Sequence, residues 1–326
     1  MAPAVKPAGP RCHRIFVTTI EDNQALKDFQ YAAATTVDEA VSLLTAGGER
    51  TKILAGGTDI LVQLREGLCE ADLVVDVKKI PALMELSYSP ATGLRLGASV
   101  PCYRVHGHPE IAAAYPGLVD AARIIGGWQI QDRASIGGNV CNSSPAADTI
   151  PPLIAYQGVC HIIGPGGPRE VPVADFCTAP GRNRLEQGEL LVTLQLSPPV
   201  PQSSAAYQRF IPRNEMDIAV VGVASWVELN TAGQTIRQAR IALAAVAATP
   251  VGADEAGSWL AGKPATDETF RQAGELAKRA ATPIDDMRGT AEFRTHLVGV
   301  LTRRTLALAV NRARSGGSAP KGIGHF

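Results

Sequence analysis

Residues 131–152 read QDRASIGGNVCNSSPAADTIPP, and they combine features that an ordinary surface loop does not need together. The adjacent Gly137 and Gly138 let a backbone approach a ligand closely, because no Cβ atom stands in the way. Short polar side chains around them supply hydrogen-bonding groups without bulk. One carboxylate follows, Asp148, which suits the hydroxyls of a ribose. By itself the stretch indicates either a ligand-binding turn or a Gly/Ser-rich surface turn.

A second glycine pair lies in residues 53–61, ILAGGTDIL. An apolar run ends at Gly56 and Gly57, and Thr58 or Asp59 then stands where a helix would begin. A strand that turns through glycines into a helix offers free N–H groups and a positive dipole end to an anion. Two such turns fit one diphosphate, because each turn can donate hydrogen bonds to one of the two phosphates. Neither turn has the GxGxxG or P-loop pattern, so the common dinucleotide and ATP motifs are not met.

The motifs LAGGTD (54–59), ASIGGN (134–139) and SPAAD (144–148) together resemble the FAD-binding (medium) subunit of the molybdenum hydroxylases. This is the family of xanthine dehydrogenase and carbon monoxide dehydrogenase. The resemblance continues through VADF (173–176), GELL (188–191) and RNEMDIA (213–219), and it spans roughly residues 14–312. It implies an α+β chain. A two-subdomain FAD-binding fold of the vanillyl-alcohol-oxidase/PCMH type would precede a C-terminal domain with an antiparallel sheet and helices.

The resemblance also implies which residues hold the cofactor. Backbone N–H groups of residues 54–60 would wrap the diphosphate, residues 135–139 would hold its other side, and Asp148 would bind a ribose or ribityl hydroxyl. Arg209 would lie near the flavin pyrimidine, where a cation favours the reduced anionic ring; the alternative is a surface salt bridge. No catalytic or metal-binding residue is expected. The expected FAD-binding residues are Leu54, Ala55, Gly56, Gly57, Thr58, Asp59, Ile60, Ile130, Ser135, Gly137, Gly138, Asn139, Asn142, Ser144, Asp148, Leu190, Leu191 and Arg209.

Four residues in or near the expected FAD site have two interpretations each. Leu190 or Leu191 would pack against the adenine or flavin edge, or would be plain core residues. Trp128 would stack on a flavin or adenine face, or would fill a subunit contact, since Gly127-Trp128 departs from the Gly-Ser-Pro common in relatives. Asp217 would hold the segment around Arg213, or would contact the flavin.

The composition excludes several classes of protein. Of the 326 residues, 31 are Lys or Arg and 31 are Asp or Glu, so the net charge is zero. This balance argues against a nucleic-acid or membrane-surface binder and favours association with other chains. The six cysteines form no C-x-x-C and no iron–sulfur pattern, which predicts reduced thiols in a cytoplasmic protein. We find no secretory h-region and no apolar run of membrane-spanning length.

No hydrolase signature such as G-x-S-x-G or H-E-x-x-H is present, so a bound cofactor is expected to supply the chemistry. In the family that the chain resembles, a large molybdopterin-binding subunit oxidises the substrate and a small subunit carries two [2Fe–2S] clusters. The FAD then passes electrons to an external acceptor such as NAD⁺ or oxygen. The resemblance implies a dimer of such heterotrimers. The alternatives are a stand-alone flavin oxidoreductase and a scaffold that has lost FAD.

The pattern along the chain predicts five segments. They are a flexible arm (1–13), a small βαβ subdomain (14–70), a second FAD-binding subdomain (71–198), a C-terminal α+β domain (203–312) and a tail (313–326). Thr36 and Glu39 form a capping box, and Ser99 is expected to cap the helix that follows it. We expect strands at 29–33, 52–55, 72–77, 94–98, 153–157, 159–163, 189–196, 206–211, 218–229 and 236–247, and helices at 118–125, 267–280 and 292–314.

Overall fold

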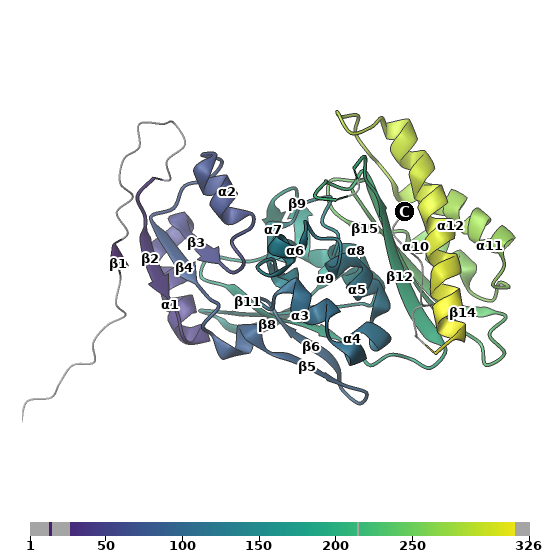
Figure 1. Cartoon of the computed structure of the whole chain (residues 1–326), viewed down its shortest axis with the longest axis horizontal. Helices are drawn as coiled ribbons and strands as arrows, with labels where there is room; N and C mark the ends of the chain where they lie inside the picture. Colours follow the sequence, from purple (N-terminus) through teal and green to yellow (C-terminus); the bar gives the residue numbers. More distant parts are fainter. Residues whose placement is uncertain (1–12, 15–26, 214, 317–326) are drawn as a thin grey trace, which may run out of the picture.

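The structure is a computed structural model that describes residues 13–14, 27–213 and 215–316. Most of the predicted arm and tail, at 1–12 and 317–326, lies outside the described residues. Three larger sheets follow one another along the long axis of the molecule, with helices between and beside them (Figure 1). Within the described residues, no helix is long and apolar enough to span a membrane.

The first sheet is small and mostly parallel. Its order is β1-β2-β4-β3, and only the edge strand β1 is antiparallel. Thr36 caps helix α1 by accepting the N–H of Glu39 at 3.1 Å, while the Glu39 carboxylate accepts the N–H of Thr35 rather than that of Thr36. The elements are β1 (His13–Arg14), β2 (Gln30–Ala33), α1 (Val37–Gly47), η1 (Gly48–Arg50), β3 (Thr51–Leu54), α2 (Ile60–Arg65) and β4 (Leu73–Asp76).

The second sheet is antiparallel, with the order β5-β6-β11-β7-β8. Short helices cover it, and a large group of buried apolar side chains lies between them and the sheet. A hairpin turn at Gly164–Gly167 joins β7 to β8. The strands are β5 (Leu86–Ser89), β6 (Gly93–Gly97), β7 (Val159–Gly164), β8 (Gly167–Pro172), β11 (Leu190–Leu196), and the separate pair β9 (Cys177–Ala179) and β10 (Arg182–Asn183). The helices are η2 (Pro81–Met84), α3 (Cys102–His106), α4 (Pro109–Ala114), α5 (Pro116–Ala122), α6 (Trp128–Gln131), α7 (Ile136–Asn142), α8 (Ile150–Ala155) and α9 (Val173–Phe176).

Strand β11 contains an irregularity that matters for the site. Its pairing with β7 shifts register between Leu191 and Thr193. A bulge changes the side to which neighbouring side chains point. Leu190 and Val192 therefore join one buried cluster, while Leu191 and Leu194 join another. A regular strand would have kept Leu190, Val192, Leu194 and Leu196 on one face.

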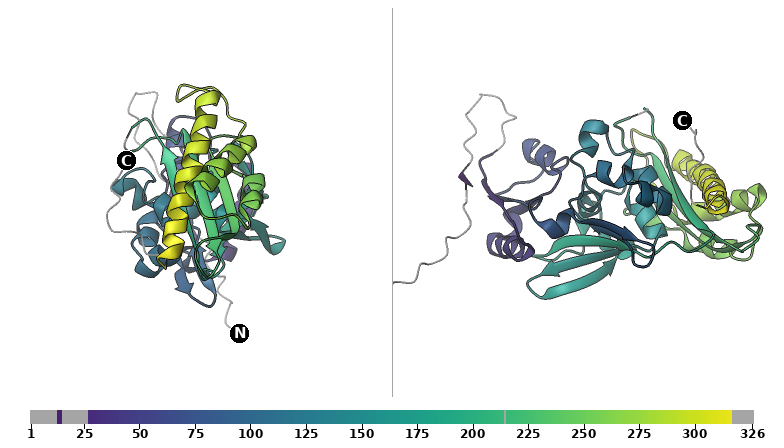
Figure 2. Two further views of the ribbon diagram at one scale, coloured as in Figure 1. Left: turned by 90° about the vertical axis from the view of Figure 1, so that its right-hand side faces the viewer. Right: turned by 60° about the horizontal axis from the view of Figure 1, so that its bottom comes forward.

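The third sheet, β12-β13-β14-β15, is antiparallel and lies between two sets of helices. Helices α10, α11 and α12 cover its outer face, as Figure 2 shows, and α5 and α8 pack on its inner face. The predicted α+β class, with an antiparallel sheet and helices at the C-terminal end, is confirmed. The elements are β12 (Ser203–Phe210), β13 (Val221–Leu229), β14 (Ile236–Ala244), β15 (Val251–Gly252), α10 (Asp254–Leu260), α11 (Asp267–Ala277), η3 (Lys278–Ala280) and α12 (Ala291–Arg314).

Small residues let α5 lie very close to β12. A Cβ atom on Gly117 would come within 2.9 Å of the Cβ atom of Ala205. Ala121, Tyr207 and Trp226 belong to the buried cluster at this junction. The C-terminal sheet is thus packed directly onto the helices that flank the second sheet.

Two expectations about local structure were wrong, and one helix was missed. Residues 153–157 belong to the end of helix α8 and the turn after it, not to a strand, because Pro151 lies in the first turn, where proline favours a helix. Ser99 does not cap α3, whose N-cap is Pro101. Helix α10 was not anticipated. Residues 153–157 are a short apolar run without a reliable period, so the sequence does not separate a strand from a buried helix in that segment.

Candidate functional site

The first glycine turn connects β3 to α2. Gly57 has a φ of +83°, a conformation that side chains with a Cβ atom rarely adopt. Lys78 donates from Nζ to the carbonyl oxygen of Ala55 at 2.9 Å and lies 3.5 Å from the Asp76 carboxylate. The start of the turn is therefore fixed from the neighbouring strand β4.

The second glycine turn begins helix α7. Ser135 is its N-cap and accepts the N–H of Gly138 at 3.0 Å. Gly137 lies against the end of β6, where an added Cβ atom would come within 2.5 Å of the Ala98 Cα atom. Only glycine permits this approach, because the opposing atoms belong to the backbone and cannot move aside cheaply.

The two turns touch each other. A Cβ atom on Gly56 would lie 2.2 Å from the carbonyl oxygen of Arg133, and Arg133 donates from Nε to the carbonyl oxygen of Gly56 at 3.2 Å. A second link joins the following helices, since Asn142 donates from Nδ2 to the Asp59 carboxylate at 3.2 Å. Segments about eighty residues apart in sequence thus form one continuous structure.

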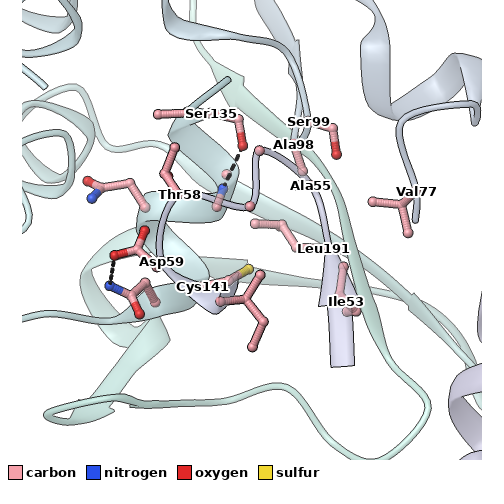
Figure 3. Close-up of a pocket in the computed structure, with 18 of the residues that line it drawn as sticks. Ile53, Ala55, Thr58, Asp59, Val77, Ala98, Ser99, Ser135, Cys141 and Leu191 are labelled. Atoms are coloured by element: carbon pink, nitrogen blue, oxygen red, sulfur yellow. Dashed lines mark hydrogen bonds between the residues drawn. The ribbon is translucent and has the colours of Figure 1, made fainter. Parts of the chain in front are cut away.

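A cavity of about 240 Å³ lies between the turns (Figure 3). In the described part of the chain, the N–H groups of Gly57, Thr58, Ile136 and Gly137 have no recorded acceptor. Such donors at the start of helices attract anions. The lining residues are Ile53, Ala55, Gly56, Gly57, Thr58, Asp59, Ile60, Gln63, Val77, Leu83, Ala98, Ser99, Ile125, Ala134, Ser135, Gly137, Gly138, Asn139, Cys141, Asn142, Leu185, Leu190 and Leu191.

The residues present fit the diphosphate of a dinucleotide. The close approaches at Gly56 and Gly137 leave the turns narrow, and the polar groups in them are mainly backbone N–H donors. Asp59 is the carboxylate at the wall, and the residue is exposed to solvent. The cavity is smaller than the ~300–1,000 Å³ of whole small-molecule pockets. It can therefore enclose only part of a dinucleotide, and the rest must extend beyond it.

Comparisons with known proteins agree with this chemistry. A family model described as "FAD binding domain in molybdopterin dehydrogenase" matches residues 27–199, and one described as "CO dehydrogenase flavoprotein C-terminal domain" matches residues 205–309. The chain belongs to the FAD-binding medium subunits of the molybdenum hydroxylases. It is similar to the xanthine dehydrogenase FAD-binding subunit of Escherichia coli O157:H7, with 31% identity over 87% of this chain and 96% of the relative.

Two carbon monoxide dehydrogenases extend the comparison. The medium chain from Hydrogenophaga pseudoflava is 30% identical over 86% of this chain and 96% of its own length. The structure titled reconstituted CO dehydrogenase from Oligotropha carboxidovorans has a TM-score of 0.84 at 28% identity, covering 88% of this chain and 99% of the other. The medium subunit described here is therefore a flavoprotein component of a molybdenum-dependent oxidoreductase, with FAD as its cofactor.

Most of the predicted cofactor-binding residues of this medium subunit lie together around the cavity. Both Leu190 and Leu191 line it, and each also belongs to a different buried core cluster. Asn139 lines the cavity and accepts the Thr149 hydroxyl at 2.7 Å. The expected FAD-binding residues that line the cavity are Ala55, Gly56, Gly57, Thr58, Asp59, Ile60, Ser135, Gly137, Gly138, Asn139, Asn142, Leu190 and Leu191.

Asp148 and Arg209 lie outside the cavity lining, next to each other. Arg209 Nη1 contacts the Asp148 carboxylate at 2.5 Å, and Tyr207 donates its hydroxyl to the same carboxylate at 2.7 Å. The other Nη atom of Arg209 donates to the carbonyl oxygen of Ile124, the residue before Ile125 in the cavity wall. The alternative of a surface salt bridge for Arg209 is wrong, because both side chains are buried. Direct contacts of this pair with FAD stay predictions.

Three further predicted residues also lie outside the lining. Leu54 and Ile130 pack in apolar clusters, and Ser144 accepts the N–H of Ala146 at 3.3 Å. Their contacts with FAD stay predictions. Asp217 pairs with Arg213 at 3.3 Å and does not line the cavity. Trp128 is 80% exposed and does not line the cavity, and both interpretations of it, flavin or adenine stacking and a subunit contact, stay predictions.

Sequence patterns did not single out much of the apolar wall. Such residues carry no motif, since an apolar residue at the end of a strand looks like any core residue. The unpredicted lining residues are Ile53, Gln63, Val77, Leu83, Ala98, Ser99, Ile125, Ala134, Cys141 and Leu185. The described residues contain no group of three or more His, Cys, Asp or Glu placed to hold a metal ion.

Proposed function

We propose that this medium subunit carries electrons from the [2Fe–2S] clusters of a small partner subunit, through FAD, to an external acceptor such as NAD⁺ or oxygen. The observation that supports this most is the contact of Gly56 with Arg133, which puts both glycine turns on one cavity. A cofactor held there by backbone atoms would leave the choice of substrate to another chain.

The chain's own role is to bind and orient the cofactor. Backbone N–H groups of Gly57, Thr58, Ile136 and Gly137 would hold the diphosphate from two sides. When bound, FAD supplies the redox chemistry, since a flavin accepts electrons singly and releases them in pairs. Lys78 would keep the first turn in its binding conformation by holding the carbonyl oxygen of Ala55.

Exposed apolar side chains support an assembly with partner chains. Trp128, Met216 and Ile218 are 80%, 59% and 50% exposed. The Met216 sulfur lies 3.7 Å from the position of a Cβ atom on Gly127, next to Trp128. Exposed apolar groups that lie together commonly mark a protein contact. We propose that they contact a partner in a complex with a large molybdopterin-binding subunit and a small [2Fe–2S] subunit, arranged as a dimer of heterotrimers.

We propose a cytoplasmic location and the domain limits 14–70, 71–198 and 203–312. The described cysteines (Cys69, Cys102, Cys141, Cys160 and Cys177) are free thiols, the state that a reducing compartment maintains. Burial raises the pKa values of Cys102 and Cys141 to about 12, so these thiols stay protonated and unreactive.

Isolation of the native protein tests the assembly. We expect the chain to co-purify with two other chains, molybdenum, iron and FAD, and to reduce an external acceptor only within that complex. A lone chain that contains FAD and oxidises an organic substrate by itself would instead identify a stand-alone flavin oxidoreductase. A chain that takes up no FAD would identify a scaffold.

A further inference from the structure

Ser99 has a buried hydroxyl group without a hydrogen-bond partner in the described part of the chain. It lies between β6 and α3, and only 2% of the residue is exposed. Its N–H donates to the carbonyl oxygen of Leu83 at 2.9 Å, which fixes the backbone. A buried hydroxyl without a partner is costly, so a native structure usually gives it one. Ser99 also lines the cavity, where a bound ligand can supply that partner.

The part of the cavity around Ser99 is an apolar slot. Figure 3 shows the Ser99 hydroxyl directed toward the cavity on the same side as Val77, Ile53 and Leu191. Val77 is 1% exposed and Leu191 is 2% exposed, so this end is enclosed by the protein. An enclosed apolar slot with one free hydroxyl suits a flat aromatic heterocycle that needs one hydrogen bond.

The opposite part of the cavity is more polar and more open. Asp59, Gln63 and Asn142 line it, and Asp59 is exposed to solvent. The glycine turns, which suit the diphosphate, lie along the same cavity. The two ring systems of FAD lie on either side of its diphosphate, so they need different ends. The flavin must exchange electrons with other molecules, whereas the adenine takes no part in electron transfer and can be enclosed.

We propose that Ser99 is the polar anchor of an adenine subsite formed with Ile53, Val77, Leu83 and Leu191. The hydroxyl hydrogen-bonds a ring nitrogen or the amino group of the adenine, and the apolar side chains cover the ring. Ser99 is thus a positioning residue that makes the subunit select FAD over flavins without an adenylate. The proposal rests on the assignment of FAD to this cavity and adds which end of the cavity holds the adenine.

The test compares Ser99→Ala with the wild-type chain after removal of the flavin. We expect Kd for FAD and Kd for ADP to rise by the same factor, about 2- to 12-fold, the range that one neutral hydrogen bond contributes. Thr193→Val is the matched control, since Thr193 of β11 has a buried hydroxyl without a recorded partner but does not line the cavity. This control should leave both Kd values unchanged.

Three results would overturn the proposal: unchanged affinity for FAD in Ser99→Ala, weaker FAD binding with unchanged ADP binding, or an equal effect of the control. A crystal structure of the FAD-loaded chain gives an independent answer. It should place Ser99 Oγ within about 3.2 Å of an adenine atom, and a longer distance would overturn the proposal. If the wild-type chain bound no FAD, the cofactor assignment would fail instead, which distinguishes the two conclusions.

Discussion

Arg312 of α12 forms a two-pronged ion pair with Asp120 of α5, although the two residues are 192 positions apart in the sequence. The distances are 2.6 Å from Nη1 to Oδ2 and 2.9 Å from Nη2 to Oδ1. The Asp120 carboxylate also accepts the N–H of Tyr207 at 3.1 Å, and Arg312 donates to the carbonyl oxygen of Ala205 at 2.9 Å. This cluster fastens the C-terminal helix and sheet to α5.

Replacement of Arg312 by methionine should lower the free energy of unfolding by about 3 kcal/mol, because it leaves a largely buried carboxylate without its cation. Urea denaturation measures the change. Arg303→Met on the same helix is the control, since Arg303 makes a similar two-pronged pair with Asp267 but both side chains are at least half exposed. That variant should change stability by no more than about 1 kcal/mol. Equal losses in the two variants would contradict the assigned role.

Gly56→Ala should weaken FAD binding by at least about tenfold. The new Cβ atom would lie 2.2 Å from the carbonyl oxygen of Arg133, so the two turns must separate and the diphosphate loses one set of donors. Flavin fluorescence during titration of the flavin-free chain reports Kd. Gly166→Ala is the control, because a Cβ atom there meets nothing within 4 Å. Normal affinity in Gly56→Ala would mean that the contact between the turns is not needed.

Lys78→Met should raise Kd for FAD by about 3- to 10-fold, because it releases the carbonyl oxygen of Ala55 and loosens the first turn. Isothermal titration calorimetry with FAD measures this. The neighbouring Lys79 is exposed, so Lys79→Met controls for loss of positive charge near the site. If both variants weakened binding equally, the effect would come from net charge and not from the turn.

Asp148 should make stability depend on pH. Burial raises its pKa from 3.8 to about 6, against the opposing effects of Arg209 and Tyr207. Its folded-state pKa therefore exceeds the unfolded value, and the contribution present below pH 4 is lost as the pH rises to about 6. We expect the unfolding free energy of the wild type, relative to Asp148→Asn, to fall by about 3 kcal/mol over that interval and then stay constant.

Denaturation at a series of pH values checks this dependence. Asp175→Asn, at an exposed carboxylate, serves as the comparison and should follow the wild type throughout. A constant difference between the wild type and Asp148→Asn from pH 4 to 7 would show that burial does not govern the Asp148 carboxyl group.

The glycine turns were predictable because their requirements are local. Gly57 has a positive φ and Ser135 caps the next helix, and both features depend on residues within a few positions. The apolar walls were not predictable, since Val77 and Leu83 have the same pattern as any buried residue. The contact between Asp148 and Arg209 was not predicted either. Arg209 and Asp148 were each expected to touch FAD, whereas the fold brings them against each other.

The amino-acid sequence by itself determined the two backbone turns, the capped start of α1 and the antiparallel C-terminal strands, because period, glycine placement and capping residues act over short distances. Tertiary structure alone decided that Gly56 meets Arg133, that Leu190 and Leu191 both line the cavity, and that Ser99 lines the cavity and caps no helix. These outcomes depend on packing between segments far apart in the chain, where burial and steric contact outweigh local preference.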